Sequence, residues 1–134
     1  MRGVTGLHHV TAIAGPAQQN LDFYAGILGM RLVKRSVNQD DPGTYHLFYA
    51  DAEGHPGTDL TFFPWAHLAP PRDGHGLSTE VALAVPPDSL EFWGQRLERY
   101  ARRSSGSRRG SATACCRSSI RTDYASRSSS RPAH

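Results

Sequence analysis

Two adjacent histidines near the N-terminus, His8 and His9, have side chains that could take part in catalysis or in binding. An imidazole can bind a metal, move a proton near neutral pH or serve as an ordinary structural hydrogen-bonding group. The β-branched residues that follow, and the stop at Gly15 and Pro16, predict a strand. Because successive side chains of a strand point to opposite faces, we expect the two imidazoles to point apart.

The remaining histidines and the two cysteines show no spacing typical of metal ligands. Cys115 and Cys116 are adjacent, which fits neither a disulfide framework nor a zinc site, so we expect a reducing, cytoplasmic setting. We interpret the other histidines as structural or solvated side chains, with His46 singled out because it lies in a predicted strand. They are His46, His55, His67, His75 and His134.

Residues 5–64 predict the element order βαβββ and hence an α+β module with one helix and a mixed, curved sheet. A helix begins near Pro16, which suits a first turn, and ends at Gly29, which suits the left-handed stop. Turns are predicted at 40–43 and 54–57 by their Asp, Pro and Gly residues. The further strands are expected at 30–37, 44–50 and 58–63.

A second, incomplete copy of this module is predicted at 76–100, after a Pro- and Gly-rich linker at 65–75. The segment Leu77–Pro86 repeats the pattern of Leu7–Pro16, and the apolar residues at 90–97 repeat those of the first helix. This copy therefore predicts one strand and one helix. It carries Ser78 and Thr79 where the first copy has the histidine pair, so the strand does not need histidines for its formation.

The last quarter of the chain, residues 101–134, differs in composition from the rest. It contains ten Ser, eight Arg and one acidic residue, whereas residues 1–100 carry a net charge of −4. Such a segment buries too little apolar surface to offset its ordering entropy, so we expect a disordered tail. We interpret it as the product of a reading-frame change near residue 100, after which the second module would otherwise continue.

The motifs of the first 64 residues resemble the vicinal oxygen chelate superfamily, which includes glyoxalases, bleomycin-resistance proteins and extradiol dioxygenases. The resemblance is strongest to ring-cleaving dioxygenases of the hydroquinone type, and residues 89–93 extend it to about Tyr100. The segments that carry it are Leu7–Thr11, Asn20–Tyr24, Leu28–Arg35, Asp41–Asp51, Gly54–Thr58 and Phe62–Pro64.

This resemblance implies an Fe(II) centre, or one of Mn(II), held by two His and one Glu, with dihydroxylated aromatic compounds as substrates. It assigns His9 to the metal and His8 to the pocket, where it would move protons. The other two ligands belong to a later module that this chain lacks. The resemblance thus implies an N-terminal fragment that is inactive by itself, and whether the chain is an enzyme stays open.

Two other functions fit some of these features. A non-catalytic binding module, like the bleomycin-resistance proteins, would use a cup of aromatic side chains, although the same residues suit an ordinary sheet core. The Arg-rich tail could neutralise nucleic-acid phosphates, but one aromatic residue in it supplies little base stacking. We expect no membrane span, and we expect homodimers or aggregates because open sheet edges invite pairing. The aromatic residues considered for the cup are Tyr45, Phe48, Tyr49, Phe62 and Phe63.

Overall fold

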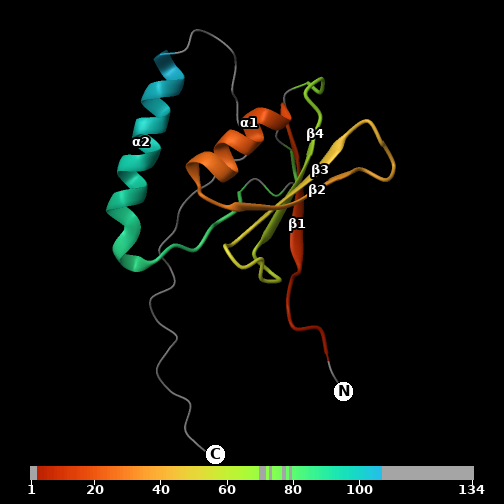
Figure 1. The fold of residues 1–134 in the computed structure, drawn as a ribbon, viewed down its shortest axis with the longest axis horizontal. Helices are drawn as coiled ribbons and strands as arrows, with labels where there is room; N and C mark the ends of the chain where they lie inside the picture. The colour runs from red at the N-terminus through yellow and green to blue at the C-terminus, as the bar shows by residue number, and fades with distance from the viewer. Residues whose placement is uncertain (1–2, 70–71, 73, 77, 79, 107–134) are drawn as a thin grey trace, which may run out of the picture. The chain divides into compact units, whose positions relative to one another are not determined.

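The computed structural model describes residues 3–69, 72, 74–76, 78 and 80–106, and the following account is confined to them. They fall into two units, one before and one after the boundary between residues 71 and 72. The first unit contains a four-stranded sheet and a helical segment, and the second contains a single long helix with a short turn before it (Figure 1). The predicted α+β class is therefore confirmed.

The sheet of the first unit is mixed and has the strand order β1-β4-β3-β2. The edge strand β1 runs parallel to β4, whereas β3 is antiparallel to both of its neighbours. The predicted βαβββ order is confirmed, and the helical segment supplies the crossover that a parallel connection needs. The strands are β1 (His9–Ala14), β2 (Arg31–Val37), β3 (Tyr45–Ala50) and β4 (Asp59–Pro64).

The helical segment between β1 and β2 begins after Pro16, as predicted, and changes its hydrogen-bond pattern midway. It consists of α1 (Ala17–Leu21) and a π-helical stretch, η1 (Asp22–Ile27). The N–H of Leu28 accordingly donates to the carbonyl of Phe23, five residues earlier, at 2.9 Å. Gly29 then ends the segment with a φ of 72°, the left-handed conformation expected of a glycine stop.

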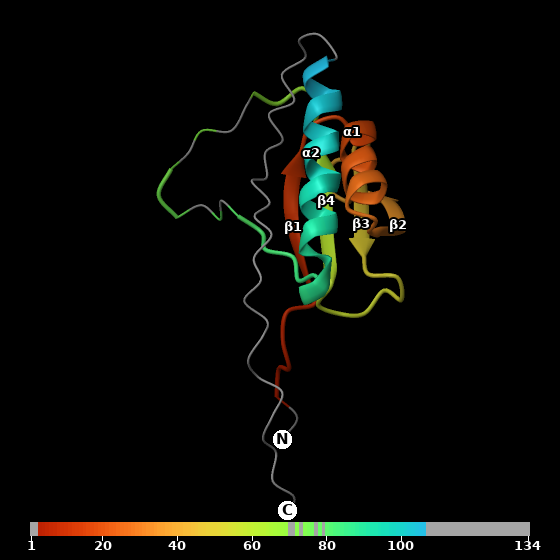
Figure 2. The same cartoon turned by 90° about the vertical axis from the view of Figure 1, so that its left-hand side faces the viewer.

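Tyr24 of η1 packs the helical segment onto one face of the sheet, as Figures 1 and 2 show for the segment labelled α1. Its ring centroid lies 4.4 Å from that of Phe62 and 5.4 Å from that of Tyr49. Leu47 and Leu60 are buried in the same core. Because side chains alternate along a strand, the neighbours of these residues in sequence must occupy the opposite face of the sheet.

The turn between β2 and β3 has the capping that its Asp-Pro-Gly sequence predicts. The hydroxyl of Thr44 donates to the carboxylate of Asp41, and the indole Nε1 of Trp65 donates to the same carboxylate at 3.0 Å. These hydrogen bonds, that of Thr44 first, lower the pKa of Asp41 below its ordinary value. Through this hydrogen bond, Trp65, which follows β4 directly, connects that strand to the turn.

In the second unit the structure departs from the sequence-based expectation at two points. The strand predicted over 77–86 is reduced to a bridge at Glu80, and Val81–Pro86 have no regular structure. A strand needs a hydrogen-bonded neighbour, and the described part of this unit contains no other strand. The expected helix does form, as η2 (Pro87–Ser89) followed by α2 (Leu90–Gly106).

The helix α2 also extends past the boundary expected near Tyr100. Ala101–Gly106 were expected to be disordered but are helical. Alanine and arginine, which occupy positions 101–103, are favourable helix residues, so the helix continues beyond the last apolar position of its pattern. The rest of the predicted tail, 107–134, lies outside the described residues.

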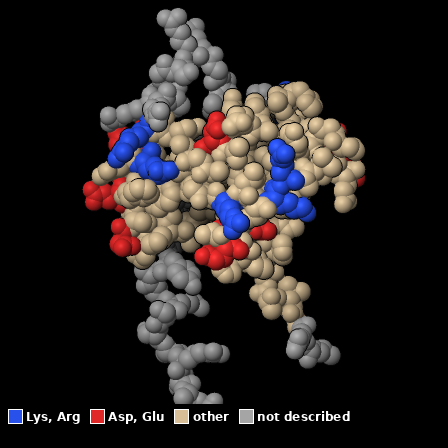
Figure 3. Space-filling model, in the orientation of Figure 1, with Lys and Arg blue, Asp and Glu red and all other residues tan. Residues whose placement is uncertain are grey.

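Most of the visible face of the described residues carries neither charge, and the basic and acidic side chains on it form a few separate groups (Figure 3). No helix within the described ranges is long and apolar enough to cross a membrane.

Candidate functional site

The sheet face opposite to α1, here called the distal face, gathers polar and aromatic side chains from all four strands. Register and alternation place Thr11 beside Thr61, and Phe48 next to Thr61 on the other side. Lys34 of β2 pairs with Phe48, and its Nζ lies 5.2 Å from the centroid of the Phe48 ring. The distal face is therefore the mixed polar and apolar surface on which a small ligand could bind.

His46 lies at the middle of the distal face between two phenylalanine rings. Its ring centroid is 4.1 Å from that of Phe48 and 4.2 Å from that of Phe63. Burial is the main cause that lowers the pKa of His46, and the positive charges that His9 and Lys34 can carry lower it further. The imidazole is therefore neutral at pH 7.

The Nε2 atom of His46 begins a chain of hydrogen bonds that crosses the sheet. It lies 3.0 Å from the hydroxyl of Thr61, which in turn donates to the hydroxyl of Thr11 at 2.8 Å. Thr61 is fully buried, so the chain satisfies a hydroxyl that water cannot reach. Sequence reasoning singled out His46 as a strand residue but missed its two threonine partners, because hydrogen bonds between strands depend on the register.

The histidine pair does not point to opposite faces, contrary to the expectation from strand alternation. The Nδ1 atoms of His8 and His9 lie 3.0 Å apart, and their rings meet edge to face with centroids separated by 5.2 Å. The reason is that β1 begins at His9, so His8 precedes the strand and alternation does not hold for it. One Nδ1 donates and the other accepts, which leaves the Nε2 atom of each exposed ring to bind other groups.

The turn before β4 holds the backbone of this pair. The N–H of Gly57 donates to the carbonyl of His8 at 2.8 Å. Gly57 has a φ of 91°, and a Cβ at this position would lie 3.2 Å from the carbonyl oxygen of Leu7. Glycine is thus required both by the backbone conformation and by the close approach of the N-terminal segment.

Beside the pair, an open pocket of about 230 Å³ is lined by His8 and by residues before it in the chain, together with Pro56. The structure therefore gives His8 a place on a pocket wall. The other lining residues are Thr5, Gly6 and Leu7.

The cup predicted from five aromatic residues is divided between the two faces of the sheet. Phe48 and Phe63 contact His46 on the distal face. Tyr49 and Phe62 are buried in the core under Tyr24, and so cannot line a ligand site. Tyr45 is 48% exposed and lies beneath the guanidinium of Arg35.

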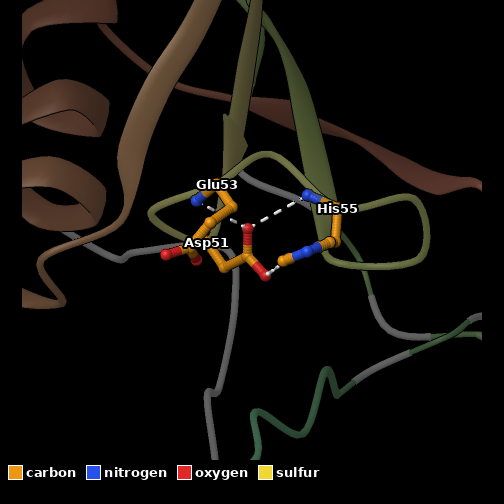
Figure 4. Close-up of side chains that lie close together, drawn as sticks. All are labelled: Asp51, Glu53 and His55. Atoms are coloured by element: carbon orange, nitrogen blue, oxygen red, sulfur yellow. Dashed lines mark hydrogen bonds and ion pairs between the residues drawn. The ribbon is translucent and has the colours of Figure 1, made fainter.

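A second polar cluster, which sequence reasoning did not identify, lies in the loop between β3 and β4 (Figure 4). Asp51, Glu53 and His55 bring their potential ligand atoms within 4.8 Å of one another. The Oδ1 atom of Asp51 accepts the backbone N–H groups of residues 53, 54 and 55, and its Oδ2 lies 2.8 Å from Nδ1 of His55. These bonds lower the pKa of Asp51 to about 2, with the backbone N–H of His55 as the largest cause.

The hydrogen bonds within this loop explain why Asp51, Glu53 and His55 lie close together. Both carboxylate oxygens of Asp51 already bind groups of the loop, and the hydrogen bond from His55 to Asp51 raises the pKa of that imidazole. An aspartate followed by a glycine three positions later, here Gly54 with a φ of 77°, is the local signal that could have predicted this capped turn.

The described residues do not by themselves fit the iron site that the resemblance implied. Asp51, Glu53 and His55 are the one group of three potential ligands among them, and this group does not include His9. His9 contacts a second imidazole, that of His8. Within the described part of the chain, no carboxylate joins these two histidines as a third ligand. The chain thus supplies a histidine pair but not the two-histidine, one-carboxylate set.

Relatives of known name match the same part of the chain. It is 52% identical over 95 residues to MhqO of Bacillus subtilis, which is named as a candidate ring-cleaving dioxygenase, and the match covers 71% of this chain and 30% of MhqO. It is 35% identical over 100 residues to the chlorohydroquinone/hydroquinone 1,2-dioxygenase of Sphingobium indicum, covering 73% of this chain and 31% of that enzyme. The chain spans about a third of the length of these relatives.

Solved structures of known proteins are similar to the same part of the chain. A crystal structure of a candidate dioxygenase from Bacillus subtilis superposes with a TM-score of 0.70 at 48% identity, and covers 75% of this chain and 33% of that one. The glyoxalase I of Leishmania major, with a TM-score of 0.59 at 13% identity over 73% of this chain and 68% of that one, shares the fold. Residues 6–101 match the model of a protein family, and the chain belongs to that family, the Glyoxalase/Bleomycin resistance protein/Dioxygenase superfamily.

Proposed function

We propose that this chain is the N-terminal module of a ring-cleaving dioxygenase that uses Fe(II) and acts on dihydroxylated aromatic compounds. The observation that carries the proposal is the combination of the sequence match to ring-cleaving relatives with the composition of the distal face. That face presents the neutral imidazole of His46 between Phe48 and Phe63, and β4 separates its strand, β3, from β1, which begins at His9. Flat aromatic ligands bind to such surfaces through ring contacts and a few directed hydrogen bonds.

In this proposal His9 supplies one ligand of the iron, and His8 exchanges protons with the substrate. The second histidine and the glutamate come from polypeptide that corresponds to the rest of the relatives, of which this chain matches about a third. The chain alone therefore binds iron weakly and does not turn over substrate. Iron bound by the complete ligand set would hold the dihydroxylated ring and O₂ in neighbouring coordination positions.

The experiment is an anaerobic Fe(II) titration of the chain, followed by exposure to O₂ with hydroquinone or catechol. We expect no ring cleavage by the chain alone. Ring cleavage should appear when the remaining two thirds of the Bacillus relative are supplied as a separate polypeptide. His9→Ala should abolish this restored activity, whereas His67→Ala, which removes an exposed histidine of the linker, should leave it unchanged.

Three results would contradict the proposal. Turnover by the chain alone would show that it is complete, and restored activity that survives His9→Ala would remove His9 from the metal. Absence of activity in every combination, while hydroquinone binds without iron, would favour a second candidate function. That candidate is a non-catalytic binding module, and the contacts of Phe48 and Phe63 on the distal face are the observation that favours it.

A further inference from the structure

The hydrogen-bond chain from His46 to Thr11 can run in one of two directions, because each threonine hydroxyl has a single hydrogen to donate. We assign the direction in which Thr61 donates to Thr11. The oxygen of Thr61 must therefore accept a hydrogen from Nε2 of His46, 3.0 Å away. Because a neutral imidazole carries one N–H, that hydrogen must be on Nε2, and Nδ1 has the lone pair.

In this direction, the hydrogen of the Thr11 hydroxyl is not used by His46 or Thr61. The oxygen of Thr11 accepts from Thr61, so its own hydrogen must point to another group. Thr11 is exposed at the edge of the distal face, whereas Thr61 is fully buried. The buried hydroxyl thus fixes the orientation of the exposed one, two residues along β1 from His9.

His46 can determine this orientation because its own ring is held in place. Phe48 and Phe63 contact the ring, with centroid distances of 4.1 Å and 4.2 Å. Rotation of the imidazole would break these contacts as well as the bond to Thr61. The donor nitrogen therefore stays directed at Thr61, and Thr61 stays directed at Thr11.

We propose that His46 is a positioning residue, which acts through Thr61 to present the Thr11 hydroxyl as a hydrogen-bond donor to the ligand of the distal face. The inference rests on the proposed function in that the ligand is a dihydroxylated aromatic compound, whose phenolic oxygen accepts the hydrogen. Thr11 then selects and orients a hydroxylated ring beside His9. If these hydrogen bonds had only a structural role, the buried hydroxyl of Thr61 would need hydrogen-bond partners, but it would not matter whether it donated to Thr11 or to His46.

The direction of this hydrogen-bond chain can be measured in the 134-residue protein without a ligand. The nitrogen chemical shifts of ¹⁵N-labelled histidine distinguish the two tautomers, and His46→Gln identifies the signals of His46. We expect the Nε2–H tautomer at pH 7. An Nδ1–H tautomer would overturn the proposal, because Thr61 would then donate to His46 and Thr11 would donate to Thr61.

Matched variants of the two threonines test the consequence for binding. Thr61→Val removes the hydroxyl with little change of shape, whereas Thr61→Ser keeps it, and the same pair can be made at Thr11. Anaerobic titration with hydroquinone should show affinity weaker by about five- to tenfold for both valine variants, as expected for one lost hydrogen bond, and near-normal affinity for both serine variants. Urea unfolding of each variant controls for loss of the fold.

These measurements separate failure of this inference from failure of the proposed function. If the parent protein binds hydroquinone and Thr61→Val binds equally well, the positioning role is wrong. If the parent protein does not bind hydroquinone, the aromatic ligand of the proposed function is wrong, and so is the part of the inference that names this ligand. The tautomer of His46 then still decides whether Thr11 is left as a donor.

Discussion

Asp51 is the residue whose interactions most fully organise a loop of this protein. Its carboxylate accepts three backbone N–H groups and contacts the imidazole of His55. The same arrangement explains the two pKa shifts in opposite directions: the backbone N–H and then the imidazole of His55 stabilise the ionised carboxylate, and the hydrogen bond to Asp51 stabilises the protonated imidazole. The cluster can therefore be understood without a bound metal.

The order of this loop should depend on pH in a window set by both groups. The pKa of Asp51 is lowered to about 2, so its contribution is complete above its ordinary value of 3.8 and is lost as the pH falls toward 2. The pKa of His55 is raised, so its contribution is complete below its ordinary value of 6.5 and is lost as the pH rises through the raised value. Protection of the Gly54 amide from hydrogen exchange, corrected for intrinsic rates, should be greatest between about pH 4 and pH 6.5.

Asp51→Ala and Asp51→Asn should both remove this pH dependence, because neither new side chain titrates. The amide oxygen of asparagine can still accept backbone N–H groups, so Asp51→Asn should keep part of the protection. A dependence unchanged in Asp51→Ala would show that other groups cause it.

Gly57 is predicted to be the glycine whose substitution disturbs the histidine pair. Gly57→Ala places a methyl group 3.2 Å from the carbonyl oxygen of Leu7 and forces an L-residue to a φ of 91°, which together should cost about 1–3 kcal/mol of the free energy of unfolding. Because the N–H of Gly57 binds the carbonyl of His8, the imidazole NMR signals of both histidines should shift.

Gly54→Ala is the matched control for this prediction. Its φ of 77° makes it similarly strained, but its added Cβ would meet only Val33, at 3.8 Å. It should therefore lower stability and leave the histidine signals in place. Equal shifts in both variants would show that the contact between Gly57 and the N-terminal segment does not position the pair.

The residue types at the site were predictable from the sequence, but their contacts were not. Alternation within a strand correctly separates Phe62 in the core from Thr61 on the distal face. It fails for His8 and His9, because the strand begins between them. The hydrogen bond from Thr61 to Thr11 joins residues 50 positions apart, and it depends on the parallel register of β1 and β4, for which no local pattern provides a signal.

At the scale of elements, Tyr24 packs the helical segment against the sheet. This ring is 6% exposed and lies against both Tyr49 and Phe62. The element order and most boundaries of the first module follow from apolar periodicity and from the Gly and Pro stops. The π-helical stretch Asp22–Ile27 does not, since the same apolar spacing also suits an α-helix.

Tyr24→Ala should therefore lower the free energy of unfolding by about 3–5 kcal/mol, because it leaves a cavity against two aromatic rings. Tyr45→Ala is the matched control within the same unit, since Tyr45 is 48% exposed, and it should cost less than about 1 kcal/mol. Urea unfolding followed by far-ultraviolet circular dichroism measures both. A small effect of Tyr24→Ala would mean that the helical segment adds little to the stability of the first unit.

At the scale of the whole molecule, the internal repeat predicted two related modules, but the two units fold differently. The first has a complete sheet in which each inner strand has two neighbours. The second has the predicted helix without the predicted strand, because strand formation depends on partners that a local sequence pattern cannot supply. A helix satisfies its own backbone hydrogen bonds, so α2 forms from its sequence and even extends beyond the repeat.

The edge strand β1 should make the protein self-associate. In the described sheet β1 pairs with β4 alone, so one row of its backbone groups faces outward. Val10 is 42% exposed and Ile13 is 52% exposed on this strand, and no charged side chain follows His9 within it to oppose pairing.

Light scattering during size-exclusion chromatography should show a mass that rises with concentration. Ile13→Lys should shift the association to at least about tenfold higher concentration, whereas Val37→Lys at the opposite edge, where Lys34 and Arg35 already lie, should change it little. A monomer at every concentration, or an equal effect of both lysine variants, would show that β1 is not the associating edge.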